Sequence, residues 1–142
     1  VLPVSLCAAI VRGDGDAREK LRAGLAEGVR FLEEATGRVL GVERHASLIE
    51  RARPALELYN DGQAEIRLAA RGVLGVPEEA PFDRILVSAE ARRLPDALVE
   101  QLADGGVMVI PVAGKMVRVV RREGEIETST HGFFRFVPLV ED

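Results

Sequence analysis

The chain has 142 residues, the size of about one domain, and 47% of them are hydrophobic, which excludes a disordered chain. Its 19 basic and 23 acidic residues are interleaved and leave a net charge of −4, so neither nucleic acid nor an anionic membrane is expected as a partner. No apolar run reaches the roughly 18–20 residues of a membrane helix. The single cysteine, Cys7, excludes an intrachain disulfide and a zinc cluster, and no metal site is expected.

The N-terminal part predicts a strand, a turn and a helix. Residues 1–11 are apolar and rich in branched side chains, and they lack the basic start and the cleavage site of a signal peptide. They end at a Gly-Asp-Gly-Asp turn, residues 13–16. In residues 17–35, the side chains of Leu21, Leu25, Val29 and Leu32 recur at helical spacing on one face.

The middle of the chain predicts two strands around a helix. Residues 38–43 form a short apolar segment that ends in Glu43. Ser47 and Glu50 have the spacing of a capping box, which opens a helix that continues to about residue 60. Residues 64–69 alternate apolar and polar side chains as a half-buried strand does.

The last part predicts mostly strands. Residues 82–88 and 107–111 read as strands on either side of a helix over residues 95–102, which Asp104-Gly105-Gly106 ends. A hairpin over residues 116–129 with a turn at Glu123-Gly124 follows, and then a last strand over residues 133–140. The succession predicts an α/β fold: a single doubly wound Rossmann-like sheet, mainly parallel, with an antiparallel C-terminal edge.

Several segments, in order, resemble landmarks of the protein-L-isoaspartate O-methyltransferase family. G-R-V-L-G-V-E-R at 37–44 and L-I-E-R-A at 48–52 resemble its second strand and helix, and E-E-A-P-F-D-R-I at 78–85 resembles the run into its fourth strand. Residues 94–112 resemble the next helix and strand, and R-F-V-P-L-V at 135–140 is similar to the closing strand. The resemblance implies a methyltransferase fold. It also implies methyl transfer from S-adenosylmethionine to L-isoaspartyl carboxylates in damaged proteins or peptides, with S-adenosylhomocysteine as product.

In an open doubly wound sheet, ligands bind beyond the carboxyl ends of the strands. Glu43 ends such a strand, where a carboxylate can accept hydrogen bonds from both ribose hydroxyls, and the family has an acid at the matching position. Arg44 and His45 follow it, and the resemblance puts them beside the adenine. A solvated surface role for Glu43 beside Arg44, and for His45 in its loop, remains the alternative.

The family's glycine loop after the first strand has two candidate positions. Residues 1–5 resemble the strand end, with Pro3 in place of the acid and Ser5 in place of the first glycine. Alternatively, Gly13 and Gly15 form the loop, although Asp14 between them would face the methionine carboxylate. Surface turn chemistry explains these glycines equally well.

A departure from the family occurs at Ala70-Arg71-Gly72. The family has Gly-Asp-Gly there, and its aspartate accepts a hydrogen bond from the adenine amino group. Arg71 has only donors and cannot accept one. Arg71 and Gly72 are therefore predicted to lie at the cofactor site but to bind the cofactor less well.

The resemblance puts Ser88, Ala89 and Glu90 on the substrate side. No G-x-S-x-G elbow surrounds Ser88, so it is not predicted to be a hydrolase nucleophile, and no catalytic residue is assigned. Arg92 and Arg93, which follow, either pair with a substrate carboxylate or are ordinary surface charges.

The resulting prediction is a single domain, residues 1–142, without the segment that precedes the first strand in the family. Its predicted function is repair methylation by a cytoplasmic monomer. A non-catalytic relative that lost its cofactor site and acts as a binding module is the alternative, favoured by Arg71. An NAD-type dehydrogenase is disfavoured because no G-x-G-x-x-G precedes Glu43.

Overall fold

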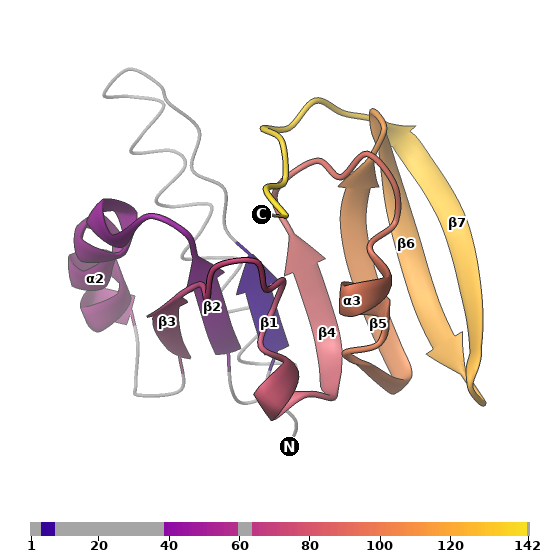
Figure 1. Ribbon diagram of the computed structural model, residues 1–142, viewed down its shortest axis with the longest axis horizontal. Coiled ribbons are helices and arrows are strands. Elements are labelled where there is room, and N and C mark those ends of the chain that lie inside the picture. Colours follow the sequence, from indigo (N-terminus) through magenta and orange to yellow (C-terminus); the bar gives the residue numbers. More distant parts are fainter. Residues whose placement is uncertain (1–3, 8–38, 60–63, 142) are drawn as a thin grey trace.

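The computed structural model describes residues 4–7, 39–59 and 64–141, and these form one sheet with short helical segments (Figure 1). The bounds, in chain order, are β1 Val4–Cys7, β2 Val39–Glu43, α2 Ala46–Tyr59, β3 Ala64–Leu68, the 3-10 helix η1 Pro77–Glu79, β4 Phe82–Val87, α3 Asp96–Val99, β5 Leu102–Val112, β6 Lys115–Arg122 and β7 Glu125–Phe133.

Within the described residues, seven strands lie in the order β3-β2-β1-β4-β5-β6-β7 (Figure 1). The first five run parallel, and β6 and β7 complete the sheet as antiparallel neighbours. The predicted fold class is therefore confirmed, including its antiparallel C-terminal edge. The strand order reverses between β1 and β4, and in sheets of this kind ligands bind outside the carboxyl ends of the strands at such a reversal.

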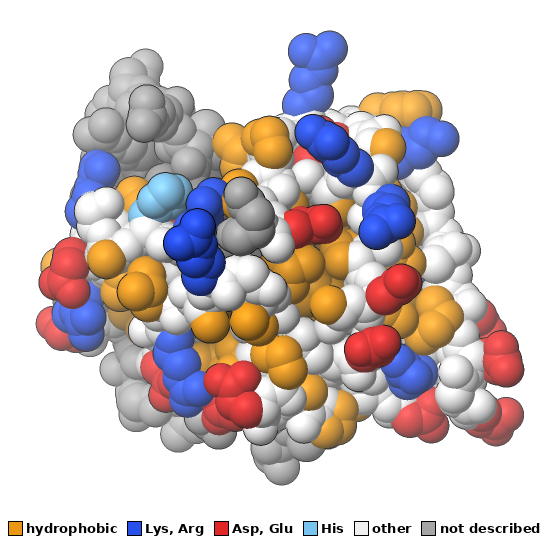
Figure 2. Space-filling view, viewed as in Figure 1, with side chains coloured by type: hydrophobic (Ala, Val, Ile, Leu, Met, Phe, Trp, Pro, Cys, Tyr) orange, Lys and Arg blue, Asp and Glu red, His pale blue; other side chains and the backbone are white. Residues whose placement is uncertain are grey.

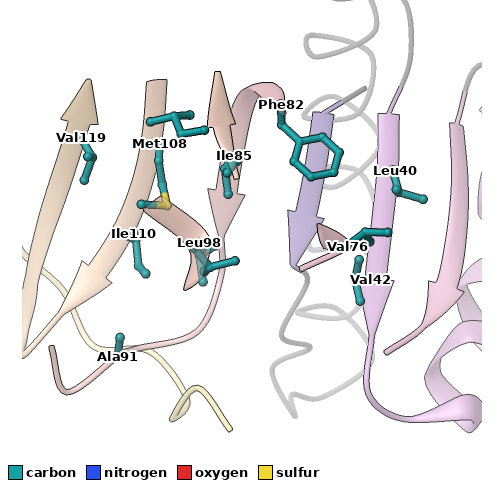
Figure 3. Close-up of a cluster of buried hydrophobic side chains, with 12 residues drawn as sticks. Leu40, Val42, Val76, Phe82, Ile85, Ala91, Leu98, Met108, Ile110 and Val119 are labelled. Atoms are coloured by element: carbon teal, nitrogen blue, oxygen red, sulfur yellow. The ribbon is translucent and has the colours of Figure 1, made fainter. Parts of the chain in front are cut away.

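The core is formed by side chains of β2, β4, β5 and β6 together with Val76 and with Leu98 of α3 (Figure 3). Leu98 of α3 lies beside Met108 and Ile110 of β5, and all three side chains are at most 1% exposed. The guanidinium of Arg121 in β6 donates from Nη2 to the carbonyl of Val99 over 2.7 Å and so fastens the end of α3 to the sheet. Burial of these apolar side chains is the main force that holds the short helix in place.

Two tight turns build the antiparallel edge. Ala113 and Gly114 connect β5 to β6 with φ angles of 48° and 81°, and Glu123 and Gly124 connect β6 to β7 with 50° and 82°. Positive φ at both central residues is the geometry of type I′ hairpin turns, whose twist matches that of the flanking strands. The predicted turn at Glu123-Gly124 is confirmed.

The predicted helix over residues 95–102 is wrong in length. α3 covers only Asp96–Val99, and β5 already begins at Leu102. Residues 103–106 bulge from the strand, because Phe82 pairs with Leu102 while Arg84 pairs with Val107. Gly105 adopts a φ of 77° inside this bulge, so the glycines bend a strand rather than end a helix.

Two further predictions on local structure are wrong. α2 begins at Ala46 and the carbonyl of His45 accepts its first hydrogen bonds, so Ser47 lies inside the helix and cannot cap it. Residues 133–140 do not form a last strand, because β7 already occupies the sheet edge up to Phe133 and a single bridge, Glu90 to Pro138, follows. The predicted helix over residues 17–35 and the glycines Gly13 and Gly15 lie outside the described residues.

Candidate functional site

A cleft of about 570 Å³ opens at the carboxyl ends of the parallel strands. Three segments build its walls: the end of β2 with the start of α2, the loop after β3, and the C-terminal segment, which crosses back to the tip of β4 (Figure 1). The lining residues are Val42, Glu43, Arg44, His45, Leu48, Ala69, Ala70, Arg71, Gly72, Val73, Leu74, Gly75, Ala89, Val137, Pro138, Leu139, Val140 and Glu141.

Glu43 is the buried acid of this cleft, with 8% of its surface exposed. Its Oε1 accepts a hydrogen bond from the backbone N–H of His45 over 2.8 Å, which fixes the carboxylate at the end of β2. Its Oε2 is buried and has no hydrogen-bond partner among the described residues. A buried carboxylate oxygen without a donor is costly, so this atom is suited to a ligand that brings hydroxyl groups.

The loop over residues 69–75 forms the second wall. The backbone N–H of Ala69 donates to the carbonyl of Glu43 over 2.8 Å, so the loop starts beside the buried acid. Val73 N–H donates to the carbonyl of Ala70 over 3.2 Å, and Gly72 between them has a φ of 70°. This tight turn carries Arg71, an exposed side chain, to the cleft.

The C-terminal segment forms the third wall. The N–H of Glu90 donates to the carbonyl of Val137 over 2.7 Å, and the N–H of Leu139 donates to the carbonyl of Glu90 over 2.8 Å. These two bonds form the parallel bridge between Glu90 and Pro138. The segment predicted as a closing strand therefore closes the cleft instead of extending the sheet.

Most of the predicted site residues that the structure describes lie in the cleft. Glu43, Arg44, His45, Arg71, Gly72 and Ala89 are brought together there from three separate parts of the sequence. Ser88 and Glu90 do not line it. Instead, Glu90 Oε1 accepts from the N–H of Gly114 over 2.5 Å and so supports the β5–β6 turn. Arg92 and Arg93 are exposed, as a surface role requires.

Charge around the cleft is uneven. Arg44, His45 and Arg71 are exposed at its rim, next to the buried Glu43. Below it, Arg67 of β3 pairs with Glu65 and Glu79, and its hydrogen bond to Glu65 raises the pKa of the Arg67 guanidinium above its ordinary value. Acidic side chains gather at the far edge, over the β6–β7 turn (Figure 2). The rim of the cleft therefore offers hydrogen-bond donors, and Glu43 offers a buried acceptor.

Sequence reasoning missed two features of this site. Gln101 is buried, with 4% of its surface exposed, and its side chain holds the loop that follows β3. Residues 137–140, which form most of one wall, were expected to belong to the last strand. No pattern in the sequence singles Gln101 out, because the charged Glu100 directly precedes it and a solvent-exposed pair of polar residues would read the same way.

A sequence profile of the family described as protein-L-isoaspartate(D-aspartate) O-methyltransferase matches residues 26–142. The chain belongs to this family. It is 40% identical over 135 residues to the protein-L-isoaspartate O-methyltransferase of Rhodospirillum rubrum, covering 89% of this chain and 61% of that protein. It is 40% identical over 117 residues to the one of Methanopyrus kandleri, covering 79% and 52%. The chain thus spans little more than half the length of these two family members.

Two solved family structures share the fold. One is a protein-L-isoaspartate O-methyltransferase from Plasmodium falciparum in complex with S-adenosyl-L-homocysteine, with a TM-score of 0.72 at 21% identity, covering 99% of this chain and 66% of that one. Another protein-L-isoaspartate O-methyltransferase superposes with a TM-score of 0.71 at 18% identity, covering 98% and 42%. Within the described residues, no helix is long and apolar enough to cross a membrane.

Proposed function

We propose that this chain binds S-adenosylmethionine in the cleft and methylates L-isoaspartyl carboxylates of damaged proteins. The observation that carries the proposal is the buried Oε2 of Glu43 at the carboxyl end of β2, which has no partner among the described residues, in a chain of this family. A ribose presents two neighbouring hydroxyl donors, and a carboxylate with one free oxygen at such a strand end accepts from them. The Plasmodium falciparum relative was solved with S-adenosyl-L-homocysteine, the product of that cofactor.

In the proposed complex, different parts of the cleft would contact different parts of the cofactor and substrate. Glu43 would hold the ribose, and the loop over residues 69–75 would lie along the base. When bound, the cofactor supplies an electrophilic methyl group. The wall formed by Ala89 and residues 137–141 would keep the acceptor carboxylate in line with that group and exclude water. Such a displacement depends mostly on positioning, which fits a site without an assigned acid or base.

Arg71 supports the second candidate, a non-catalytic binding module. It is exposed in the cleft wall and has only donors, where the resemblance implies an acceptor for the adenine amino group. It also adds positive charge near a sulfonium. The ribose side of the cleft therefore fits the cofactor, and the base side fits it less well.

Calorimetric titration of the purified chain with S-adenosylhomocysteine tests the proposal. We expect binding, and we expect Glu43→Ala to weaken it about 100-fold, because two hydrogen bonds to a charged acceptor are lost. The control is Glu57→Ala, which removes an exposed acid of α2 outside the cleft and should leave the affinity unchanged. Absence of binding by the wild-type chain at millimolar ligand would refute the enzyme proposal and favour the binding module.

A methylation assay with matched isoaspartyl and aspartyl peptides tests the substrate. We expect transfer only to the isoaspartyl peptide. Equal rates with both peptides would refute the repair role. Isoaspartyl proteins as partners stay a prediction, which this assay tests. A monomeric state and a cytoplasmic location are predictions too, which size-exclusion chromatography and cell fractionation can check in turn.

A further inference from the structure

Gln101 lies between α3 and β5 and is buried, although its side chain is polar. All of its hydrogen-bonding groups face backbone. Its Oε1 accepts from the N–H of Val76 over 2.9 Å, and its Nε2 donates to the carbonyls of Leu74 and Ala97, each over 2.8 Å. The side chain therefore joins α3 to the end of the loop that lines the cleft.

The loop is shaped to receive this side chain. Gly75 has a φ of 70°, and a Cβ built on it would lie 2.3 Å from Gln101 Oε1. Only glycine permits both the backbone conformation and such a close approach. Gly75 and Gln101 therefore fit together as a pair.

The loop over residues 69–75 is held at both ends. At its start, the N–H of Ala69 donates to the carbonyl of Glu43. At its end, Gln101 holds Leu74 and Val76. Leu74 and Gly75 line the cleft, whereas Gln101 does not, so Gln101 can act on a ligand only through the loop.

We infer that Gln101 is a positioning residue, which holds the 69–75 loop in the conformation that receives S-adenosylmethionine. The inference rests on the proposed function, because it concerns the same cleft. Its physical reason is the cost of leaving the buried Val76 N–H and the partly buried Leu74 C=O without partners, so the loop end would move to find water or other partners. Loop movement would then displace Leu74 and Gly75, which line the cleft, from the ligand.

The experiment is calorimetric titration of the variant Gln101→Met with S-adenosylhomocysteine. Methionine has a similar size but lacks the hydrogen bonds, and we expect the dissociation constant to rise about tenfold or more. The control is Ile110→Val, which shortens a fully buried side chain of β5 that does not line the cleft. It should change the dissociation constant by less than about twofold.

Gln101→Glu provides the conservative comparison and a second variant if Gln101→Met does not fold. Glutamate keeps an acceptor for Val76, but its carboxylate would face the carbonyls of Leu74 and Ala97 without a donor, so its affinity should also fall below that of the wild type. Amide hydrogen exchange gives a readout that a general loss of stability would not reproduce. In Gln101→Met, the Val76 amide should exchange faster while the amides of β5 and β6 keep their protection.

The outcomes separate the two proposals. If the wild type binds S-adenosylhomocysteine and folded Gln101→Met or Gln101→Glu binds it equally well, the inference is overturned and the proposed function stands. If the wild type does not bind, the proposed function fails, and with it the role of Gln101 toward the cofactor. Unchanged exchange at Val76 in Gln101→Met would overturn the anchoring of the loop itself.

Discussion

Glu43 and Arg71 both line the cleft, but they offer a ligand opposite hydrogen-bonding groups. The carboxylate of Glu43 is buried and fixed by the N–H of His45, with one oxygen free among the described residues. The guanidinium of Arg71 is exposed at the tip of a turn. The first demands a donor and the second demands an acceptor or an anion, so the affinity for a nucleoside depends on the balance of the two.

Replacing Arg71 by aspartate tests this balance. We expect Arg71→Asp to bind S-adenosylhomocysteine about tenfold more tightly, because a charged acceptor gains a hydrogen bond from the adenine amino group. Calorimetry measures the change, and Arg92→Asp, an exposed arginine outside the cleft, is the control with the same change of charge. Equal or weaker binding by Arg71→Asp would show that the adenine amino group does not face this residue.

At the scale of elements, the residues at the centre of the two hairpin turns affect how stable these turns are. Both turns have positive φ at their two central positions, and glycine fills the second position each time, at Gly114 and Gly124. The first positions are Ala113 and Glu123, neither of which favours that conformation. These turns form because the strands on both sides pair, and the residues at the first positions reduce stability.

Ala113→Asn should therefore stabilise the protein by about 0.5–1 kcal/mol, because asparagine tolerates the left-handed conformation that a type I′ turn requires. The N–H of residue 113, which donates to the carbonyl of Ala91, is unaffected. Urea unfolding measures the free energy. Ala97→Asn, at an exposed helical alanine, should bring no gain, and an equal gain there would contradict the role of the turn.

At the scale of the molecule, one buried cluster joins the parallel and antiparallel parts of the sheet. It extends from Leu40 and Val42 of β2, through Phe82 and Ile85 of β4, to Val119 of β6 (Figure 3). Phe82 is fully buried at the start of β4, where the β4–β5 pairing also begins. Its ring therefore contributes to the stability of the whole sheet rather than to one element.

Phe82→Ala should lower the free energy of unfolding by about 3–5 kcal/mol, because it removes buried surface and leaves a cavity. Phe134→Ala is the matched control: its ring is 49% exposed and contacts Phe136 at a centroid distance of 6.5 Å. Phe134→Ala should lower the free energy of unfolding far less than Phe82→Ala does. Similar costs for both variants in urea unfolding would refute the central place of Phe82 in the core.

Much of the fold could be predicted because short-range patterns determine it. Apolar runs predicted β2, β4 and the hairpin, and the β–α–β order predicted the parallel sheet with its antiparallel edge. The helix over residues 95–102 was overestimated, because its apolar pattern also suits a strand. Leu102 belongs to a strand because it pairs with Phe82 of β4.

By itself, the sequence determined the family, the fold class and the acid at the end of β2, since each depends on residue type and order along the chain. Only the tertiary structure decided that residues 137–141 form a wall of the cleft, because β7 had already occupied the sheet edge that they would need. It alone also brought Gln101 to Leu74 and Val76, more than 20 positions away. Such contacts depend on which strands become neighbours, and no local pattern encodes that distance.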